Sequence, residues 1–146
     1  MTIPTHIIAG LIIGKATGNY TTSILAASLV DFDHVISYAK NGLMQKPEKL
    51  WKTMTREEDL YGDQRGYLHN IFSFLALTII AVLINTQVGI VFSLGYLSHL
   101  ILDAMDKSDF WPLYPMKNFR IRGFIKYFSY QELIFAAILV VVFFLI

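Results

Sequence analysis

His99 and Asp103 are the residues whose types and spacing most directly suggest chemistry. They lie four positions apart in an apolar stretch, within the run Gly-Tyr-Leu-Ser-His-Leu-Ile-Leu-Asp at residues 95–103. On an α-helix this spacing places an imidazole and a carboxylate on one face, one turn apart. Because ionisable side chains are costly in an apolar helix, such a pair usually marks a functional site or a partner. We interpret the pair as half of a metal site at the edge of a membrane bundle.

The sequence contains no cysteine, so a bound metal ion must be held by imidazole and carboxylate groups. Such ligands suit a divalent transition metal, with Zn²⁺ the most favoured and Mn²⁺ or Fe²⁺ as alternatives. The ion would activate water for attack on an ester or phosphoester. The predicted ligands are the four histidines and two aspartates: His6, Asp33, His34, His69, His99 and Asp103.

Three further polar residues are candidates for a role in catalysis. Glu132 or Asp31 could accept a proton from the attacking water, and Arg65 could hold a phosphate group. Each also has a structural interpretation, since Glu132 is an acid in a first helical turn and Asp31 could cap a helix or pair with a cation. A histidine near a helix end can equally be a simple hydrogen-bond partner. The prediction therefore depends on these residues converging at one place.

The composition indicates a membrane protein. Apolar residues make up 55% of the 146 positions and charged residues 16%, whereas soluble domains have roughly 25% charged residues. Residues 71–84, 88–97 and 133–146 contain no Lys, Arg, Asp or Glu. We therefore expect one membrane-embedded helical domain over residues 1–146. The net charge of +1 predicts no general attraction to nucleic acid.

We predict an all-α fold, an integral membrane bundle of about five helices. The expected helices cover residues 7–16, 21–38, 67–85, 88–105 and 130–146, as two helical hairpins and a C-terminal helix. The first two are short for full spans, which need about 20 residues. Gly10, Gly14 and Gly18 are four apart, which favours a smooth stripe for close helix packing. A short interfacial helix near residues 47–56 is a further possibility.

The basic residues predict which side the site faces. Eleven of the twelve Lys and Arg lie in residues 40–65 and 106–128, and Lys15 alone is near the opposite turn. The positive-inside rule makes the basic side cytoplasmic. All four histidines are predicted in the same layer, so the site would face the cytoplasm from the inner membrane. The acidic residues Glu57, Glu58 and Asp59 are expected to form a solvated charge run.

Four blocks of sequence together resemble a known family. They are Pro-Thr-His-x3-Gly at residues 4–10, Asp-x-Asp-His at 31–34, Arg-Gly-x-x-His at 65–69, and the run at 95–103 followed by Trp111 and Pro112. In order and spacing they look like the inner-membrane-associated metal-dependent hydrolases, one branch of which is known as LexA-regulated. The resemblance covers nearly the whole chain. It implies a membrane-embedded helical protein with metal ligands among the six residues named above.

Two further comparisons bear on the activity. A distant likeness to zinc-dependent phospholipase C and the P1-type nucleases favours phosphoester hydrolysis. The chain also departs from the resembled family, which usually has His-Arg-x-x-Thr-His-Ser where this sequence has Gln-Arg-Gly-Tyr-Leu-His-Asn at residues 64–70. Gln64 thus replaces a histidine and Leu68 a threonine. If that histidine binds a second metal ion in relatives, this chain holds one ion fewer or is inactive.

The sequence leaves three functional classes open. The leading hypothesis is a membrane-bound, phosphoesterase-like metal-dependent hydrolase. Its substrate would be a lipid or lipid-linked ester or phosphoester at the cytoplasmic membrane face, and its expected partner is membrane lipid. The second class is a non-catalytic membrane protein with a structural metal ion, which Gln64 keeps open. The third is a small transporter, which the lack of charges near the middle of the predicted spans disfavours.

Overall fold

The structure, a computed structural model, describes residues 1–56, 59–61 and 64–146. Within these ranges it contains seven helices and no strand, apart from two isolated β-bridges in the connection of residues 106–125. The helices are α1 (Ile3–Thr17), α2 (Tyr20–Leu29), α3 (Phe32–Lys40), α4 (Pro47–Met54), α5 (Ile71–Ile84), α6 (Thr86–Met105) and α7 (Tyr130–Leu145). The all-α prediction is confirmed for this part of the chain. Glu57 and Glu58 of the predicted charge run lie outside the described residues.

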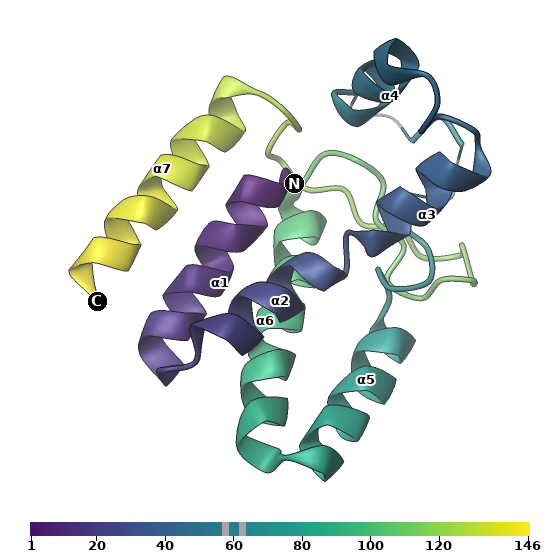
Figure 1. The fold of residues 1–146 in the computed structure, drawn as a ribbon. Helices are drawn as coiled ribbons and strands as arrows, with labels where there is room; N and C mark the ends of the chain where they lie inside the picture. The colour runs from purple at the N-terminus through teal and green to yellow at the C-terminus, as the bar shows by residue number, and fades with distance from the viewer. Residues whose placement is uncertain (57–58, 62–63) are drawn as a thin grey trace.

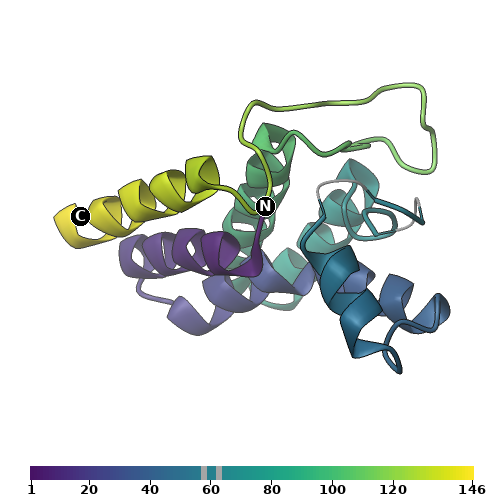
Figure 2. The same cartoon turned by 90° about the horizontal axis from the view of Figure 1, so that it is seen from above.

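Helix α6 is the centre of the packing (Figure 1). It packs against α1, α2 and α5, while α7 packs against α1. Figures 1 and 2, at right angles to each other, both show α1 and α7 side by side, with α3 and α4 extending away from the packed group. Three helices from separate parts of the sequence thus pack on α6, which is the arrangement needed to bring distant side chains together.

Local capping fixes where several helices begin. The side-chain oxygens of Asn19, Asn70, Asn85 and Ser129 accept hydrogen bonds from backbone N–H groups in the first turns of α2, α5, α6 and α7. Asn85 both ends α5 and caps α6, which makes the hairpin between them tight. Gly18 ends α1 in the left-handed conformation, with φ 74°, a conformation that favours glycine.

Small residues let the helices approach closely. A Cβ atom added at Gly10 would lie 2.9 Å from the Cα atom of Ile24, and one added at Gly14 would lie 2.7 Å from the ring of Tyr20. Two glycines of the predicted stripe therefore face α2, whereas Gly18 is a helix cap. Gly95 makes the equivalent approach from α6 to α2. Helix α2 therefore packs closely on both α1 and α6, because glycines at these contacts leave room for its backbone.

The structure corrects several predicted boundaries. The helix expected over residues 21–38 is two helices, α2 and α3, separated at Val30 and Asp31. The helix expected from residue 67 begins at Ile71, so Arg65 and His69 lie in the preceding connection and do not open a helix. The fourth predicted helix begins two residues earlier than expected, at Thr86. The short helix considered near residues 47–56 is present as α4.

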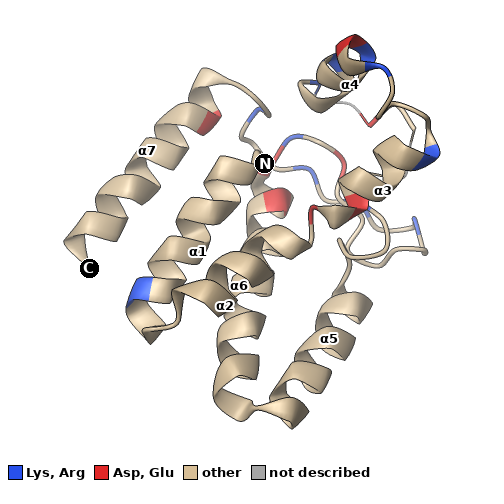
Figure 3. Cartoon of the chain, viewed as in Figure 1, with Lys and Arg blue, Asp and Glu red and all other residues tan. Residues whose placement is uncertain are grey.

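The described chain buries a cluster of polar groups beside small apolar clusters such as that of Val30, Tyr96 and Leu100, and it exposes many large apolar side chains. Leu83 and Ile84 at the end of α5 are 80% and 81% exposed, while His6, His69 and His99 are 0% exposed. Among the described residues, α6 is the one helix long and apolar enough to cross a membrane; α1, α5 and α7 are apolar but shorter. Figure 3 shows most of the charged residues gathered toward one end of the molecule, away from the far end of α1, where a basic residue is drawn.

The close approach of α6 to α2 predicts the effect of Gly95→Ala. In a free helix this change stabilises by about 1 kcal/mol, because alanine is the better helix former. Here the new Cβ would lie 2.7 Å from the backbone oxygen of Ser23, so overpacking reverses the sign. We expect a lower Tm of the detergent-solubilised protein than for Ser93→Ala on the same helix. A Tm equal to or above that of the natural chain would contradict this packing.

Candidate metal centre

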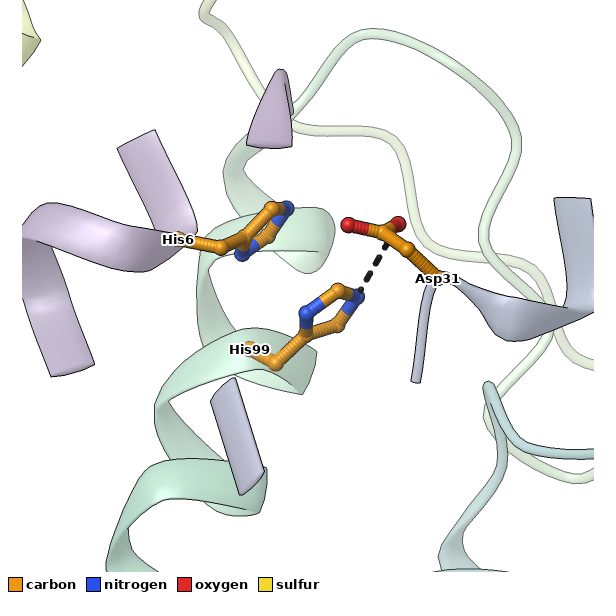
Figure 4. Close-up of side chains that lie close together, drawn as sticks. All are labelled: His6, Asp31 and His99. Carbon is orange, nitrogen blue, oxygen red and sulfur yellow. Dashed lines mark ion pairs between the residues drawn. The ribbon is translucent and has the colours of Figure 1, made fainter. Parts of the chain in front are cut away.

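The four histidines of the chain meet at one place although they come from separate elements. His6 lies on α1, His34 on α3, His69 in the connection before α5, and His99 on α6. The rings of His6 and His99 are stacked with centroids 3.7 Å apart, and the His69 ring lies 5.1 Å from that of His99 and 5.3 Å from that of His34. Asp31, between α2 and α3, points into the same space (Figure 4). The predicted convergence of the imidazoles is therefore present.

Three overlapping groups within this cluster have donor atoms close enough to share one metal ion. They are His6 with Asp31 and His99, Asp31 with His34 and His69, and His69 with His99 and Asp103; the atoms of each group lie within 4.8 Å of one another. The imidazole Nε2 atoms of His34, His69 and His99 lie 3.4–3.8 Å from Oδ1 of Asp31. Two ligands of one tetrahedral zinc ion are about 3.3 Å apart, because each lies about 2.0–2.1 Å from the metal. The donor atoms present therefore fit a divalent ion.

The hydrogen bonds of two imidazoles aim their lone pairs into the cluster. Nδ1 of His99 lies 2.6 Å from the carbonyl oxygen of Ala27, and Nδ1 of His69 lies 3.2 Å from Oδ2 of Asp33. Since both acceptors require a proton on Nδ1, each Nε2 is left as a lone-pair donor. These two Nε2 atoms lie 3.2 Å apart. Two neutral imidazoles would bring two lone pairs together at this distance, so the geometry requires either a metal ion or a proton on one Nε2 between them.

Asp33 builds the connection that carries His69. Its Oδ2 accepts hydrogen bonds from the backbone N–H groups of Gly66, Leu68 and His69, at 3.2, 2.6 and 3.3 Å. Tyr96 on α6 donates to the carbonyl of Leu68, which ties the connection to the central helix. Asp33 therefore lies behind His69 and outside the three ligand groups. The sequence predicted Asp33 as a metal ligand. Its contacts instead suit a residue that orients the ring of His69.

Arg65 and two aspartates form a buried charge network on the far side of Asp103. Nε of Arg65 lies 3.1 Å from Oδ2 of Asp103, and its Nη2 lies 3.3 Å from Oδ2 of Asp106. The amino nitrogen of Met1 lies 2.9 Å from the same oxygen of Asp106. Asp106, which is not among the residues predicted for the site, is 0% exposed. Its position directly after α6 and three residues from Asp103 is the signal that could have identified it.

The electrostatics of the cluster favour a cation. Burial lowers the pKa of His69, but its bonds to Asp31 and Asp33 and the charge of Asp103 outweigh burial and raise that pKa above its ordinary value. Burial and the neighbouring His69 lower the pKa of His34 to about 4. His34 is therefore neutral at neutral pH, the form in which imidazole binds a metal ion.

Glu132 lies away from the cluster. Its Oε1 accepts hydrogen bonds from the backbone of Thr2 and, at 3.1 Å, from the hydroxyl of Thr5. Its Oε2 accepts from the backbone N–H of Phe128 at 2.8 Å. With both oxygens engaged and 2% exposure, Glu132 joins the start of α7 to the start of α1. Of the three predicted catalytic residues, Asp31 and Arg65 are at the cluster and Glu132 is not.

Fold and site together define a class of helical protein with an apolar exterior and a buried cluster of imidazoles and carboxylates. The family model of the YdjM inner membrane protein matches residues 1–146, the whole sequence. The chain therefore belongs to the YdjM inner membrane protein family. No curated protein and no solved structure matches it. Membership supports the predicted membrane location, and the family description names no activity.

The role of Asp33 predicts the effect of Asp33→Ala. The change leaves three backbone N–H groups without an acceptor, at about 1–3 kcal/mol for each group that stays buried. We expect the connection of residues 66–69 to open and trypsin to cleave after Arg65, whose side chain is 9% exposed in the folded protein. Asp109→Ala is the matched control, because that carboxylate pairs with Arg120 and Arg122 at the surface. Equal cleavage of both variants would refute the role assigned to Asp33.

Proposed function

We propose that the cluster binds a divalent metal ion, Zn²⁺ by preference, and that the protein is a metal-dependent hydrolase. The observation that carries the proposal is the pair of facing Nε2 atoms of His69 and His99, 3.2 Å apart with carboxylate oxygens of Asp31 and Asp103 beside them. Several lone pairs of imidazole and carboxylate thus point toward one small buried space, which is the arrangement that a metal ion requires. The residues that would hold the ion are His6, Asp31, His34, His69, His99 and Asp103.

The residues around the ion have distinct roles in the proposed hydrolysis. The metal ion would supply a Lewis acid that activates water and polarises the ester. Asp31 has an oxygen, Oδ2, without a hydrogen-bond partner in the described structure, and it is the group we assign to accept a proton from the attacking water. Arg65 would hold the phosphate of the substrate. Asp33 and the Ala27 carbonyl would fix the orientation of the His69 and His99 rings through their Nδ1 atoms.

The membrane supplies the setting for this chemistry. We propose that α1, α5, α6 and α7 form an integral bundle whose apolar exterior contacts lipid, with the cluster at the cytoplasmic face. Family membership, the exposed apolar side chains and the gathering of basic residues at one end support this arrangement. A phosphoester or ester of a lipid, or of a lipid-linked molecule, would then reach the site from the membrane surface.

A structural metal site is the second candidate. It is favoured by the complete burial of His6, His69 and His99, because structural zinc sites are closed whereas catalytic ones keep an open position. Against it, Asp31 and His34 line an open cleft, so one side of the cluster is reachable. Activity of the metal-loaded protein distinguishes the two candidates.

The metal site predicts the result for His99→Ala combined with Asp103→Ala. Protein purified without chelators should contain at least one divalent ion per chain, and the double variant should lose it, because each ligand contributes to binding. Metal content of the purified proteins by mass spectrometry is the measurement. Asp109→Ala, on the same side but outside the cluster, should keep its metal. Metal-free natural protein would eliminate the proposed site.

Hydrolysis is tested separately. The metal-loaded natural chain should cleave a model phosphodiester such as bis(p-nitrophenyl) phosphate, and the double variant should not. A metal-loaded chain that is inactive on phosphoesters and on lipid esters would leave the structural site as the function.

A further inference from the structure

A large cleft opens beside the metal centre. It has a volume of about 1170 Å³ and reaches the cluster at Asp31, His34 and Arg65. Binding sites for small molecules commonly have volumes of about 300–1000 Å³. The cleft is therefore far larger than an inorganic anion requires, and it has room for a head group with part of a chain.

Two buried donors at the floor of the cleft lack a partner. Gln64 is 7% exposed and the Arg65 side chain 9% exposed, and both residues line the cleft. Neither Nε2 of Gln64 nor Nη1 of Arg65 has a hydrogen-bond acceptor within the described part of the chain. The remaining nitrogens of Arg65 are engaged by Asp103 and Asp106. Because a buried donor without an acceptor is costly, this pair calls for acceptor oxygens brought by a ligand.

The rim of the cleft adds positive charge. Six basic residues line it, namely Arg56, Arg65, Lys107, Lys117, Arg122 and Lys126, against the acidic residues Asp31, Asp59 and Asp109. Arg122 is neutralised by Asp109, with Nε 2.5 Å from Oδ1. No carboxylate among the described residues pairs with Lys107 or Lys126. The unneutralised charge at the rim therefore favours an anion.

One wall of the cleft is apolar. Met44, Leu50 and Met54, from α4 and the residues before it, line the cleft, as do Trp111 and Tyr114. Met44 is 55% and Met54 36% exposed, so these side chains are available for contact with a hydrocarbon chain. A ligand that is only an anion would leave this wall uncovered, whereas an amphiphile would cover it.

We propose that the cleft binds a phosphate group carried on an apolar chain. The Gln64 amide and the Arg65 guanidinium donate to the phosphate oxygens at the floor, Lys107 and Lys126 add charge at the rim, and the chain lies along Met44, Leu50 and Met54. Gln64 is then a ligand-binding residue, because its amide N–H donates to a phosphate oxygen. An imidazole bound to a metal ion through the same nitrogen could not donate there. The assignment names the substrate class of the proposed hydrolase and rests on that proposal for its catalytic meaning.

Native mass spectrometry of the full chain in detergent tests the proposal with three probes: dioleoyl phosphatidate, dioleoylglycerol and inorganic phosphate. Phosphatidate should bind most tightly, because it alone satisfies both the donors and the apolar wall. Equal binding of dioleoylglycerol would overturn the role of the donors. Equal binding of inorganic phosphate would overturn the apolar chain. This comparison uses the natural chain, so it holds even where a variant fails to fold.

Variants then locate the contact. Gln64→Met removes the amide donor at similar size and should weaken phosphatidate binding about tenfold. Gln45→Met, an exposed glutamine that does not line the cleft, is the matched control. Lys107→Gln with Lys126→Gln should weaken binding severalfold, and Lys46→Gln with Lys49→Gln should not. Unchanged affinity in Gln64→Met would refute the assignment.

Metal content measured on the same samples separates the two proposals. Gln64→Met should keep the metal ion while losing phosphatidate. Selective phosphatidate binding by a protein that contains no metal would uphold the cleft and overturn the hydrolase. Metal without phosphatidate selectivity would overturn the cleft and leave the metal site standing.

Discussion

The rest of the structure depends on the meeting of the buried imidazoles of His69 and His99. His69 and His99 both have Nδ1 engaged by an acceptor, and their Nε2 atoms face each other at 3.2 Å. Without a positive charge between them, this geometry brings two lone pairs together in a dry interior. The break after α2 that places Asp31, the folded connection that holds His69, and the position of α6 all serve to surround that charge.

Burying such a cluster needs a scaffold that approaches closely and keeps water out. Gly10, Gly14 and Gly95 allow α1 and α6 to pack directly on α2, and the Ala27 carbonyl on α2 is thereby brought to His99. The apolar side chains that a soluble protein would place in this core lie on the exterior instead. The buried polar cluster and the exposed apolar side chains are compatible with the membrane location that family membership supports.

The sequence predicted the parts that follow from spacing and charge. His99 and Asp103 could be placed on one face because four residues make one helical turn, and the histidines could be placed in one layer because apolar segments alternate with basic connections. The break at Val30 and Asp31 could not be predicted, because no Pro or Gly marks it and tertiary contacts decide it. The role of Asp33 depends on tertiary contacts, since sequence alone does not distinguish a metal ligand from a carboxylate that orients one. Glu132 has the same sequence signature as a catalytic base, and its place between α1 and α7 follows only from its contacts in the fold.

Hydrogen-bond acceptors and donors without partners lie on different sides of the site. Lone pairs of imidazole and carboxylate converge on the buried side, while the free donors of Gln64 and Arg65 lie on the cleft side. A cation and an anion are therefore called for at adjacent positions, with Asp31 and His34 lining the boundary between them. Gln64, at a position where the resembled family has a histidine, places an amide donor on the cleft side of the cluster. The same residue that departs from the resembled pattern thus suits the anionic side of the site, and an amide, which does not titrate, keeps that donor at every physiological pH.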